Sequence, residues 1–264
     1  MGSINPVFLL PGKLKESAAE VAKIYAGSIT LGVGQFCTNP GLIIGPDGKE
    51  LQQFMDILGE EIAKVAPGTM LHPGIAKGYV TNREKALAQK DVSTVAVSAT
   101  GAGENQGLPT VASATGQAFL NNPVLHQEVF GPYSLVIRCK DMNEMQEVAS
   151  HLEGQLTATL MATENDLRDH PAITDAVQDI CGRFIINGVP TGVEVCLAMH
   201  HGGPFPATSD SRFTSVGADA IKRFARPVSY QSWPDNFLPE ELQNNNPLGI
   251  WRTVNNELTK GPVA

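Results

Sequence analysis

Gly32-Val33-Gly34-Gln35-Phe36-Cys37-Thr38-Asn39-Pro40 leads, through Gly41, into the short apolar run Leu42-Ile43-Ile44, which Gly45-Pro46 ends. An apolar run of this length before turn residues is typical of a buried strand. On either side of it, residues 13–31 and 49–65 carry apolar side chains at helical spacing. A buried strand between two amphipathic helices predicts an α/β layer fold with a largely parallel sheet.

The same alternation of strand and helix patterns continues to about residue 186. Further strands are predicted at 93–98, 110–114, 135–137, 156–162 and 183–186, and further helices at 75–90, 141–152 and 171–181. We therefore predict an α/β domain in three layers over residues 1–205. Residues 206–264 are expected to form a loop, an edge strand at 226–231, where Pro227 is tolerated, and a polar tail.

Length, charge and cysteine content exclude several classes of protein. The chain has 264 residues and a net charge of −8, which argues against nucleic-acid and anionic-membrane partners. No apolar run is long enough to span a bilayer, and the first residues do not form a signal peptide. Four widely separated cysteines do not resemble a disulfide framework. We expect a protein of a reducing compartment, the cytoplasm.

Cys37 is the strongest candidate for chemistry on the residues alone. Flanking glycines let the backbone bend and leave room beside the thiol. A thiolate is a strong nucleophile towards carbonyl carbon, but an isolated thiol is only a few per cent ionised at pH 7, so a base or charge must help. A buried structural cysteine remains the commoner role for such a residue. Core packing is the better interpretation for Cys139, Cys181 and Cys196.

Two other groups of residues offer weaker signals. His200 and His201, with Cys196 and Asp210, are metal-ligand types without a recognised spacing, so we predict no metal site. Gln127-Glu128-Val129-Phe130-Gly131-Pro132 places a carboxylate and an aromatic ring on a turn before a strand. Glu128 could accept hydrogen bonds from a sugar diol, although a surface glutamate beside a packed phenylalanine explains the spacing equally well. No complete glycine-rich dinucleotide motif is present.

Taken together, three segments resemble motifs of the aldehyde dehydrogenase superfamily. Gly34-Gln35-Phe36-Cys37 is similar to its catalytic Gly-Gln-x-Cys motif. Glu128-Val129-Phe130-Gly131-Pro132 is similar to its Glu-x-Phe-Gly-Pro motif, and residues 1–6 to the tail of its Glu-Leu-Gly-Gly-x-x-Pro motif. The three occur in the family's order, so the whole chain resembles the C-terminal, catalytic half of such an enzyme.

Other segments narrow the resemblance to one branch, the 2,5-dioxovalerate (α-ketoglutarate semialdehyde) dehydrogenases. These are residues 3–8, 190–195, 201–210 and 226–231. The chain departs from the common family pattern in three places. Gly32 stands where an Asn is usual, residues 38–41 replace the usual continuation, and the Pro-rich loop 202–210 replaces a Gly- and Ser-containing loop. These departures favour the narrower branch.

The resemblance implies a role for each candidate residue. Cys37 would be the nucleophile, Glu128 would hold the ribose of NAD or NADP, and Phe130 would pack near the nicotinamide. Phe36, Thr38 and Phe205 would lie near the aldehyde. The family's general-base Glu, its oxyanion-hole Asn and its cofactor domain precede the part matched here, so we expect this chain alone to bind no cofactor and to show no dehydrogenase turnover. A homo-oligomer is implied for the intact enzyme.

Two other functions remain open from the residues. The first is a cysteine hydrolase or acyltransferase in which Cys37 is the nucleophile and His200 or His201 the base. No acid at a recognisable spacing would orient that histidine. The second is a non-catalytic assembly domain, because the surface on which a cofactor domain docks would be exposed.

Overall fold

The computed structural model describes residues 2–263. By their contacts these residues form two units, divided after Ile221, whereas the sequence pattern changes near residue 205. The first unit contains Cys37 and every other candidate site residue. No helix within the described residues is both long enough and apolar enough to cross a membrane.

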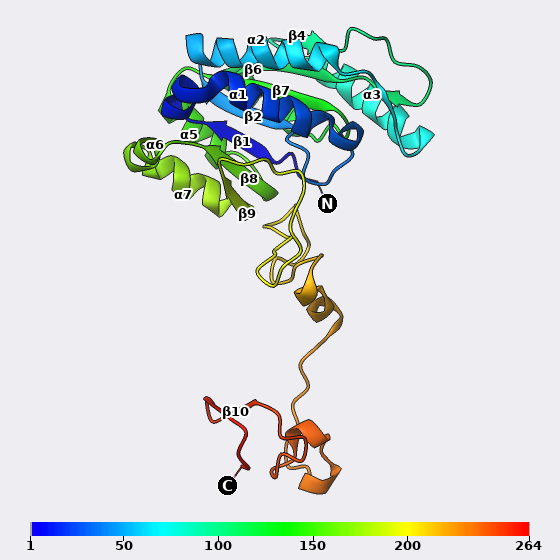
Figure 1. Ribbon diagram of the computed structural model, residues 1–264, viewed down its shortest axis with the longest axis vertical. Helices are drawn as coiled ribbons and strands as arrows, with labels where there is room; N and C mark the ends of the chain where they lie inside the picture. Colours follow the sequence, from blue (N-terminus) through cyan, green and yellow to red (C-terminus); the bar gives the residue numbers. More distant parts are fainter. Residues whose placement is uncertain (1, 264) are drawn as a thin grey trace. The chain divides into compact units, whose positions relative to one another are not determined.

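A seven-stranded sheet forms the centre of the first unit, in the order β4-β6-β7-β2-β1-β8-β9 (Figure 1). Every neighbouring pair is parallel except β4 with β6, which confirms the predicted sheet type. The strands are β1 (Pro6–Leu9), β2 (Leu42–Pro46), β4 (Ser93–Val97), β6 (Thr110–Thr115), β7 (Tyr133–Cys139), β8 (Gln155–Met161) and β9 (Cys181–Ile186). The near-central β1 was not predicted, because four residues between two prolines give too short a pattern.

Helices cover both faces of this sheet, which confirms the predicted three layers (Figure 1). Alternate strand residues point to opposite faces: Val7 and Ile43 pack under α1 (Pro11–Thr30) and α2 (Lys49–Lys64). Phe8 and Ile44 point to the other face. That face is covered by α3 (Pro73–Leu87), α4 (Gly116–Asn121), α5 (Met142–Ser150) and α7 (Pro171–Asp179), with α6 (Glu164–Asp169) leading into α7.

Shorter elements connect the main helices and strands. They are the 3₁₀ turns η1 (Leu31–Gly34) and η2 (Pro123–His126), and a two-stranded ribbon of β3 (Gly68–Thr69) and β5 (Gln106–Gly107). The segment 201–217 is an irregular loop, as its composition predicts, and η3 (Ala218–Phe224) follows it.

The second unit corrects the sequence-based prediction. Residues 226–231 form no strand, and six residues that include Pro227 offer one backbone donor fewer for pairing. A hairpin of β10 (Arg252–Val254) and β11 (Glu257–Thr259) lies further on, after the turns η4 (Asp235–Phe237) and η5 (Glu240–Leu242). Its turn is Asn255-Asn256, both with positive φ, as a type I′ turn requires. The three-residue strands were too short to be predicted.

Candidate active site

Cys37 lies on the loop between η1 and β2, and its thiol is exposed. The backbone beneath it is fixed by buried asparagines. The Nδ2 of Asn5 donates to the carbonyl oxygens of Cys37 (3.0 Å) and Asn39 (2.9 Å). Asn39 in turn donates to the carbonyl of Gly131 (3.1 Å). The thiol is therefore open to solvent while its main chain is held from below.

A left-handed turn brings this loop onto the Glu-x-Phe-Gly-Pro segment. Gly32, Val33 and Gly34 all have φ between 55° and 65°, which is rare for a β-branched residue such as Val33. A Cβ on Gly34 would lie 2.2 Å from the carbonyl carbon and oxygen of Gly131, so only glycine fits there. Two motifs that lie far apart in the sequence thus meet backbone to backbone.

Val33 is held in this conformation by glycines of the β3–β5 ribbon. A Cβ on Gly68 or Gly107 would lie 2.6 or 2.8 Å from the methyl groups of Val33. Left-handed valine costs of the order of 1–2 kcal/mol, which surrounding packing must offset. The ribbon is therefore part of what shapes the Cys37 loop.

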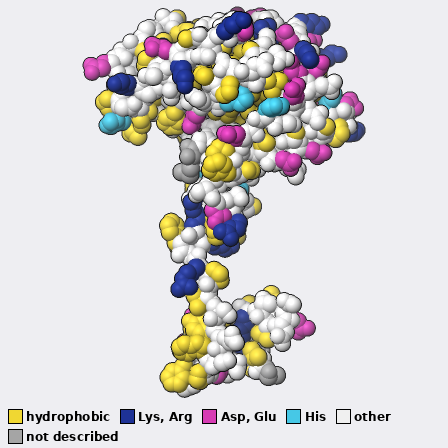
Figure 2. Space-filling view, turned by 180° about the vertical axis from the view of Figure 1, so that it is seen from behind, with side chains coloured by type: hydrophobic (Ala, Val, Ile, Leu, Met, Phe, Trp, Pro, Cys, Tyr) yellow, Lys and Arg dark blue, Asp and Glu magenta, His cyan; other side chains and the backbone are white. Residues whose placement is uncertain are grey.

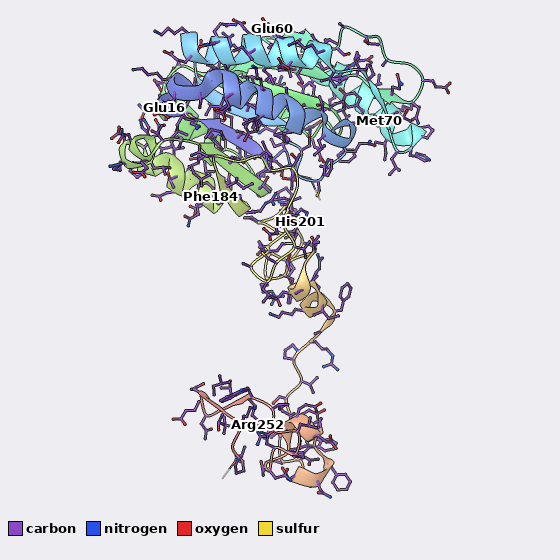
Figure 3. All side chains as sticks on the ribbon, viewed as in Figure 1. Glu16, Glu60, Met70, Phe184, His201 and Arg252 are labelled. Atoms are coloured by element: carbon purple, nitrogen blue, oxygen red, sulfur yellow. The ribbon has the colours of Figure 1, made fainter. Side chains whose placement is uncertain are left out.

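His201 is the histidine that the structure brings to Cys37. Its Nε2 lies 3.3 Å from Cys37 Sγ, whereas the structure records no contact of His200 with that thiol. The His201 N–H donates to Thr214 Oγ1 (2.8 Å), and its carbonyl accepts from the Ser215 N–H (2.9 Å). Figure 3 labels His201 in the loop that follows β9.

The loop that carries His201 is packed tightly on the sheet. A Cβ on Gly182 would lie 2.0 Å from the Gly202 carbonyl oxygen, and one on Gly203 would lie 2.1 Å from that of Gln155. Glycine is therefore required at positions 182 and 203. The close approach fixes the main chain that follows His201.

Charges around the pair favour a neutral imidazole. Burial lowers the pKa of His201, and the charges of Arg183 and His200 lower it further. Burial also lowers the pKa of the Arg183 guanidinium, while negative charge on Cys37 raises it. The Arg183 guanidinium donates to the carbonyl of Pro190 (2.5 Å). Cys37 is thus close to a neutral base and a cation.

The Cys37 backbone N–H is available to a ligand. Within residues 2–263 it donates to no other group. A free N–H on the nucleophile's own residue is the kind of donor that stabilises an oxyanion formed by attack on a carbonyl.

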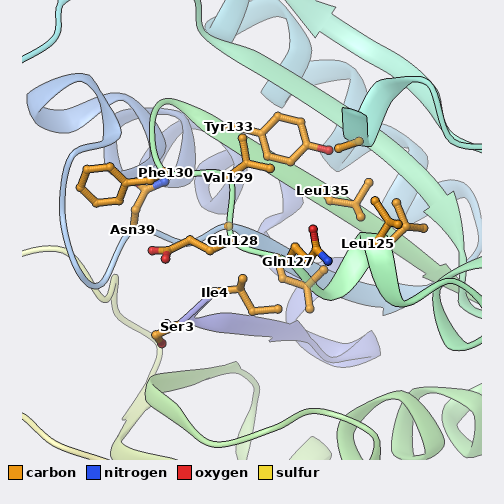
Figure 4. A pocket seen from close by; sticks show the side chains of 14 residues that line it. Ser3, Ile4, Asn39, Leu125, Gln127, Glu128, Val129, Phe130, Tyr133 and Leu135 are labelled. Atoms are coloured by element: carbon orange, nitrogen blue, oxygen red, sulfur yellow. The ribbon is translucent and has the colours of Figure 1, made fainter. Parts of the chain in front are cut away.

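Glu128 and Phe130 line cavities beside the Cys37 loop. Glu128 is half-buried at a cavity of about 280 Å³, whose lining includes Ser3, His126 and Gln155. Phe130, Asn39 and Glu128 line a neighbouring cavity of about 20 Å³ (Figure 4). Burial raises the pKa of the Glu128 carboxyl, which has no hydrogen-bond partner among the described residues. Its two free acceptor oxygens and the larger cavity fit a ribose diol.

The three residues predicted to contact the substrate differ in how exposed they are. Phe36 is half-buried, with its ring against Gly32. Thr38 is only 3% exposed, so its side chain does not reach solvent. Phe205 is 81% exposed, and its carbonyl accepts from the Gly154 N–H (3.2 Å). Within residues 2–263, no group of three His, Cys, Asp or Glu side chains could hold a metal ion.

Three structural contributors to the site were not singled out from the sequence: Asn5, Asn39 and Arg183. Asn5 has a left-handed φ of 50° and is 1% exposed. Its position before Pro6 at the start of an apolar run was the available signal, because asparagine tolerates left-handed backbone. Arg183 lay within a predicted strand, where nothing marks which end faces a site.

Comparison with known proteins shows what the chain as a whole is similar to. No family model matches the chain. It is 46% identical over 252 residues to α-ketoglutaric semialdehyde dehydrogenase 2 of Azospirillum brasilense, covering 96% of this chain and 48% of that protein. It is 42% identical over 261 residues to α-ketoglutaric semialdehyde dehydrogenase of Acinetobacter baylyi, covering 98% and 50%. The chain spans about half the length of these curated relatives.

Solved structures agree on the fold. A salicylaldehyde dehydrogenase from Pseudomonas putida aligns with a TM-score of 0.65 at 18% identity, over 87% of this chain and 47% of that one. The chain has the fold of an aldehyde dehydrogenase over the part that aligns. A glyceraldehyde-3-phosphate dehydrogenase from Methanocaldococcus jannaschii, solved with NADP, aligns with a TM-score of 0.61 at 18% identity, over 77% and 43%. The resemblance to the aldehyde dehydrogenase superfamily is confirmed.

Proposed function

We propose that this chain is the catalytic portion of an NAD(P)-dependent aldehyde dehydrogenase that oxidises α-ketoglutarate semialdehyde to 2-oxoglutarate through a thioester on Cys37. The observation that carries the proposal is the exposed Cys37 thiol, held on an anchored loop that packs directly on the Glu128–Pro132 segment. The substrate class follows the names of the two curated relatives, both α-ketoglutaric semialdehyde dehydrogenases.

The chain's own residues perform the first bond change. Cys37 Sγ attacks the aldehyde carbon, the S–C bond forms, and the carbonyl π pair moves to oxygen. The free Cys37 N–H donates to that oxyanion; loss of one such donor typically costs on the order of 100- to 1000-fold in rate. After oxidation the substrate is a thioester, and water cleaves the C–S bond to release the acid and restore the thiol.

The cofactor would be held by Glu128 and Phe130. Glu128 would accept from ribose hydroxyls, and the Phe130 ring would pack near the nicotinamide. NAD(P)⁺, when bound, supplies an acceptor for the hydride that leaves the substrate carbon. The related glyceraldehyde-3-phosphate dehydrogenase solved with NADP supports this class of cofactor.

The test is protection of Cys37 from alkylation, with Cys196 as a second exposed thiol in the same molecule. Peptide mapping would follow iodoacetamide labelling of both. We expect α-ketoglutarate semialdehyde to slow labelling at Cys37 and not at Cys196. 2-Oxoglutarate, which has the ketone but no aldehyde, should protect neither. Equal labelling of the two thiols in all conditions would overturn the proposal.

The 264-residue chain assayed alone should form no NADH or NADPH. The resemblance assigns the general base and the cofactor domain to the other portion of such enzymes, and the chain spans only half of its curated relatives. Co-expression with the unmatched portion of the Azospirillum brasilense relative should produce turnover. Steady reduced-nicotinamide formation by the chain alone would contradict this expectation.

A second candidate function is nicotinamide-independent hydrolysis or acyl transfer, which the 3.3 Å Cys37–His201 contact favours. Against it, the sequence offers no acid at a recognisable spacing that would orient the imidazole as the third member of a hydrolytic triad. Multiple turnovers on an ester without nicotinamide, lost in His201→Ala and retained in His200→Ala, would select this function.

Self-association is proposed for the intact protein. The second unit exposes aromatic and aliphatic side chains, which Figure 2 shows in yellow at its surface. They include Phe224, Trp233, Phe237, Trp251 and Leu258. Solvated apolar side chains at this density are typical of an interface. Light scattering across concentrations tests this, and a monomer at every concentration would contradict it. A cytoplasmic location is likewise proposed, and four free cysteines support it.

A further inference from the structure

The contact between Cys37 and His201 joins residues 164 positions apart in the chain. In the sequence, His200 and His201 were equal candidates for a base, and only in the hydrolase alternative. The structure assigns His201 a role in the dehydrogenase: we propose that its Nε2 accepts the proton of the Cys37 thiol, so that this chain activates its own nucleophile. This inference rests on the proposed function and adds a residue to it.

The geometry holds the imidazole at the sulfur. The Sγ–Nε2 distance of 3.3 Å is within hydrogen-bonding range for sulfur. The His201 main chain is fixed on both sides, by Thr214 Oγ1 and by the Ser215 N–H. The following glycines press directly on Gly182 and Gln155. A nucleophile and a base in contact, each on an anchored main chain, are the recurring arrangement of activated thiols.

The charged groups around the pair suit a proton that moves and returns. Arg183 and His200 face His201, and Arg183 also faces Cys37. Burial and these charges lower the pKa of His201, so the imidazole is neutral and has a free lone pair at neutral pH. The Arg183 cation stabilises a thiolate and destabilises the imidazolium. The proton is therefore held by His201 only while sulfur carries charge or is bonded to substrate.

The step balances without any further reagent. The proton leaves Sγ for Nε2 as the S–C bond forms, and the carbonyl π pair moves to the substrate oxygen. The proton returns from Nε2 to sulfur when water cleaves the thioester and the thiol reforms. The general base that the resemblance assigns to the other portion of the enzyme is then needed for the water alone.

Alkylation kinetics of the two exposed thiols test this in the chain as it exists. Labelling rates of Cys37 and Cys196 would be mapped from about pH 5 to about pH 9, the range in which imidazole and thiol titrate. In His201→Gln, we expect the Cys37 rate near pH 7 to fall roughly tenfold, because an isolated thiol is only about 3% ionised there. The shape of the Cys37 pH profile should also change, because the thiol has lost its base. His151→Gln, at an exposed position at the end of α5, is the matched control and should leave the Cys37 profile shape unchanged.

A purely structural role for His201 predicts another pattern. Thr214→Val loosens the loop but keeps the imidazole, so it should lower the rate less and leave the shape of the pH profile intact. An unchanged Cys37 profile in His201→Gln would overturn the proposal, while aldehyde protection of Cys37 would still support the dehydrogenase. Absence of aldehyde protection in the unaltered chain would instead remove the proposed function, whatever the histidine variants do.

Discussion

Cys37 and Cys196 are both free and exposed, yet their surroundings differ. The Cys37 main chain is held by Asn5, its loop packs on Gly131, and its sulfur touches an imidazole. Cys196 lies among exposed apolar residues, and the bond from the Met199 N–H to its carbonyl is what holds its own main chain in the described part of the chain. Exposure alone therefore does not distinguish a nucleophile from a surface thiol.

Anchoring matters because catalysis needs an atom at a fixed place. Holding a reacting group in position removes the entropy that would otherwise be lost in the transition state. Cys37 has a main chain held from below by the Asn5 side chain and an imidazole at its sulfur, and among the described residues Cys196 has neither contact. The difference between these two thiols can be measured within one molecule.

Removing each thiol in turn should give the largest effect. Acylation by an activated ester, followed by mass spectrometry, measures nucleophilic capacity without a cofactor. We expect Cys37→Ala to lower acyl-enzyme formation by at least about 100-fold, because the nucleophile itself is lost. Cys196→Ala should change it less than about twofold. If acyl-enzyme formation fell by similar factors in the two variants, Cys37 and Cys196 would not differ as nucleophiles.

The backbone contact below Cys37 should come next in size. Gly34→Ala places a methyl group 2.2 Å from Gly131 at a φ of 65°, so we expect a loss of about 3 kcal/mol of unfolding free energy. Gly27→Ala is the matched control, because a Cβ there meets nothing within 4 Å and lies in a helix. Gly27→Ala should raise the free energy of unfolding by about 0.5–1 kcal/mol. Thermal unfolding of both variants measures this, and equal melting temperatures would contradict it.

Two buried, left-handed asparagines allow a sharper test. Asn5 and Asn246 both have φ of 50°; the Asn5 Nδ2 donates to three carbonyls and the Asn246 Nδ2 to two. Asn5→Asp replaces those donors by a carboxylate that faces the carbonyls, which should cost about 2 kcal/mol and lower the Cys37 alkylation rate. Asn246→Asp makes the same change in the second unit and should leave that rate unaltered. If the Cys37 alkylation rate fell in both variants, unfolding rather than anchoring of the Cys37 loop would set that rate.

Features that depend on neighbouring residues were predicted from the sequence, and features that depend on contacts between distant residues were not. The helix at 49–64 and the strand at 133–139 were predicted as 49–65 and 135–137, because helical spacing and apolar runs are local patterns. The hairpin at 252–259 was missed because its strands are short, although the pair Asn255-Asn256 carries a turn signal. The choice between His200 and His201 depended on a contact across 164 positions, which no spacing rule contains. The roles of Asn5 and Arg183 are of the same long-range kind.

Glu128 gives the smallest predicted effect and tests the cavity beside the Cys37 loop. Its pKa is raised in the folded protein by burial, so the unfolded chain ionises first as pH rises. Below about pH 4 both states are protonated and the carboxyl costs nothing. Above that pH its ionisation opposes folding, and the penalty is complete once pH exceeds the folded pKa. Glu128→Gln should therefore be more stable than the unaltered chain at neutral pH, and the gain should vanish in acid.

The gain should be less than about 1 kcal/mol, because water screens a half-exposed group. Glu16→Gln, at an exposed position of α1, is the control for the substitution itself. Thermal unfolding between about pH 4 and about pH 8 spans the range in which the carboxyl titrates. Glu128→Gln should also leave the ratio of Cys37 to Cys196 alkylation unchanged, since the hydrogen bonds of Cys37 among the described residues include none to Glu128. A changed ratio would mean that the two motifs share one electrostatic site, and that Cys37 differs from Cys196 by more than its anchoring and its histidine.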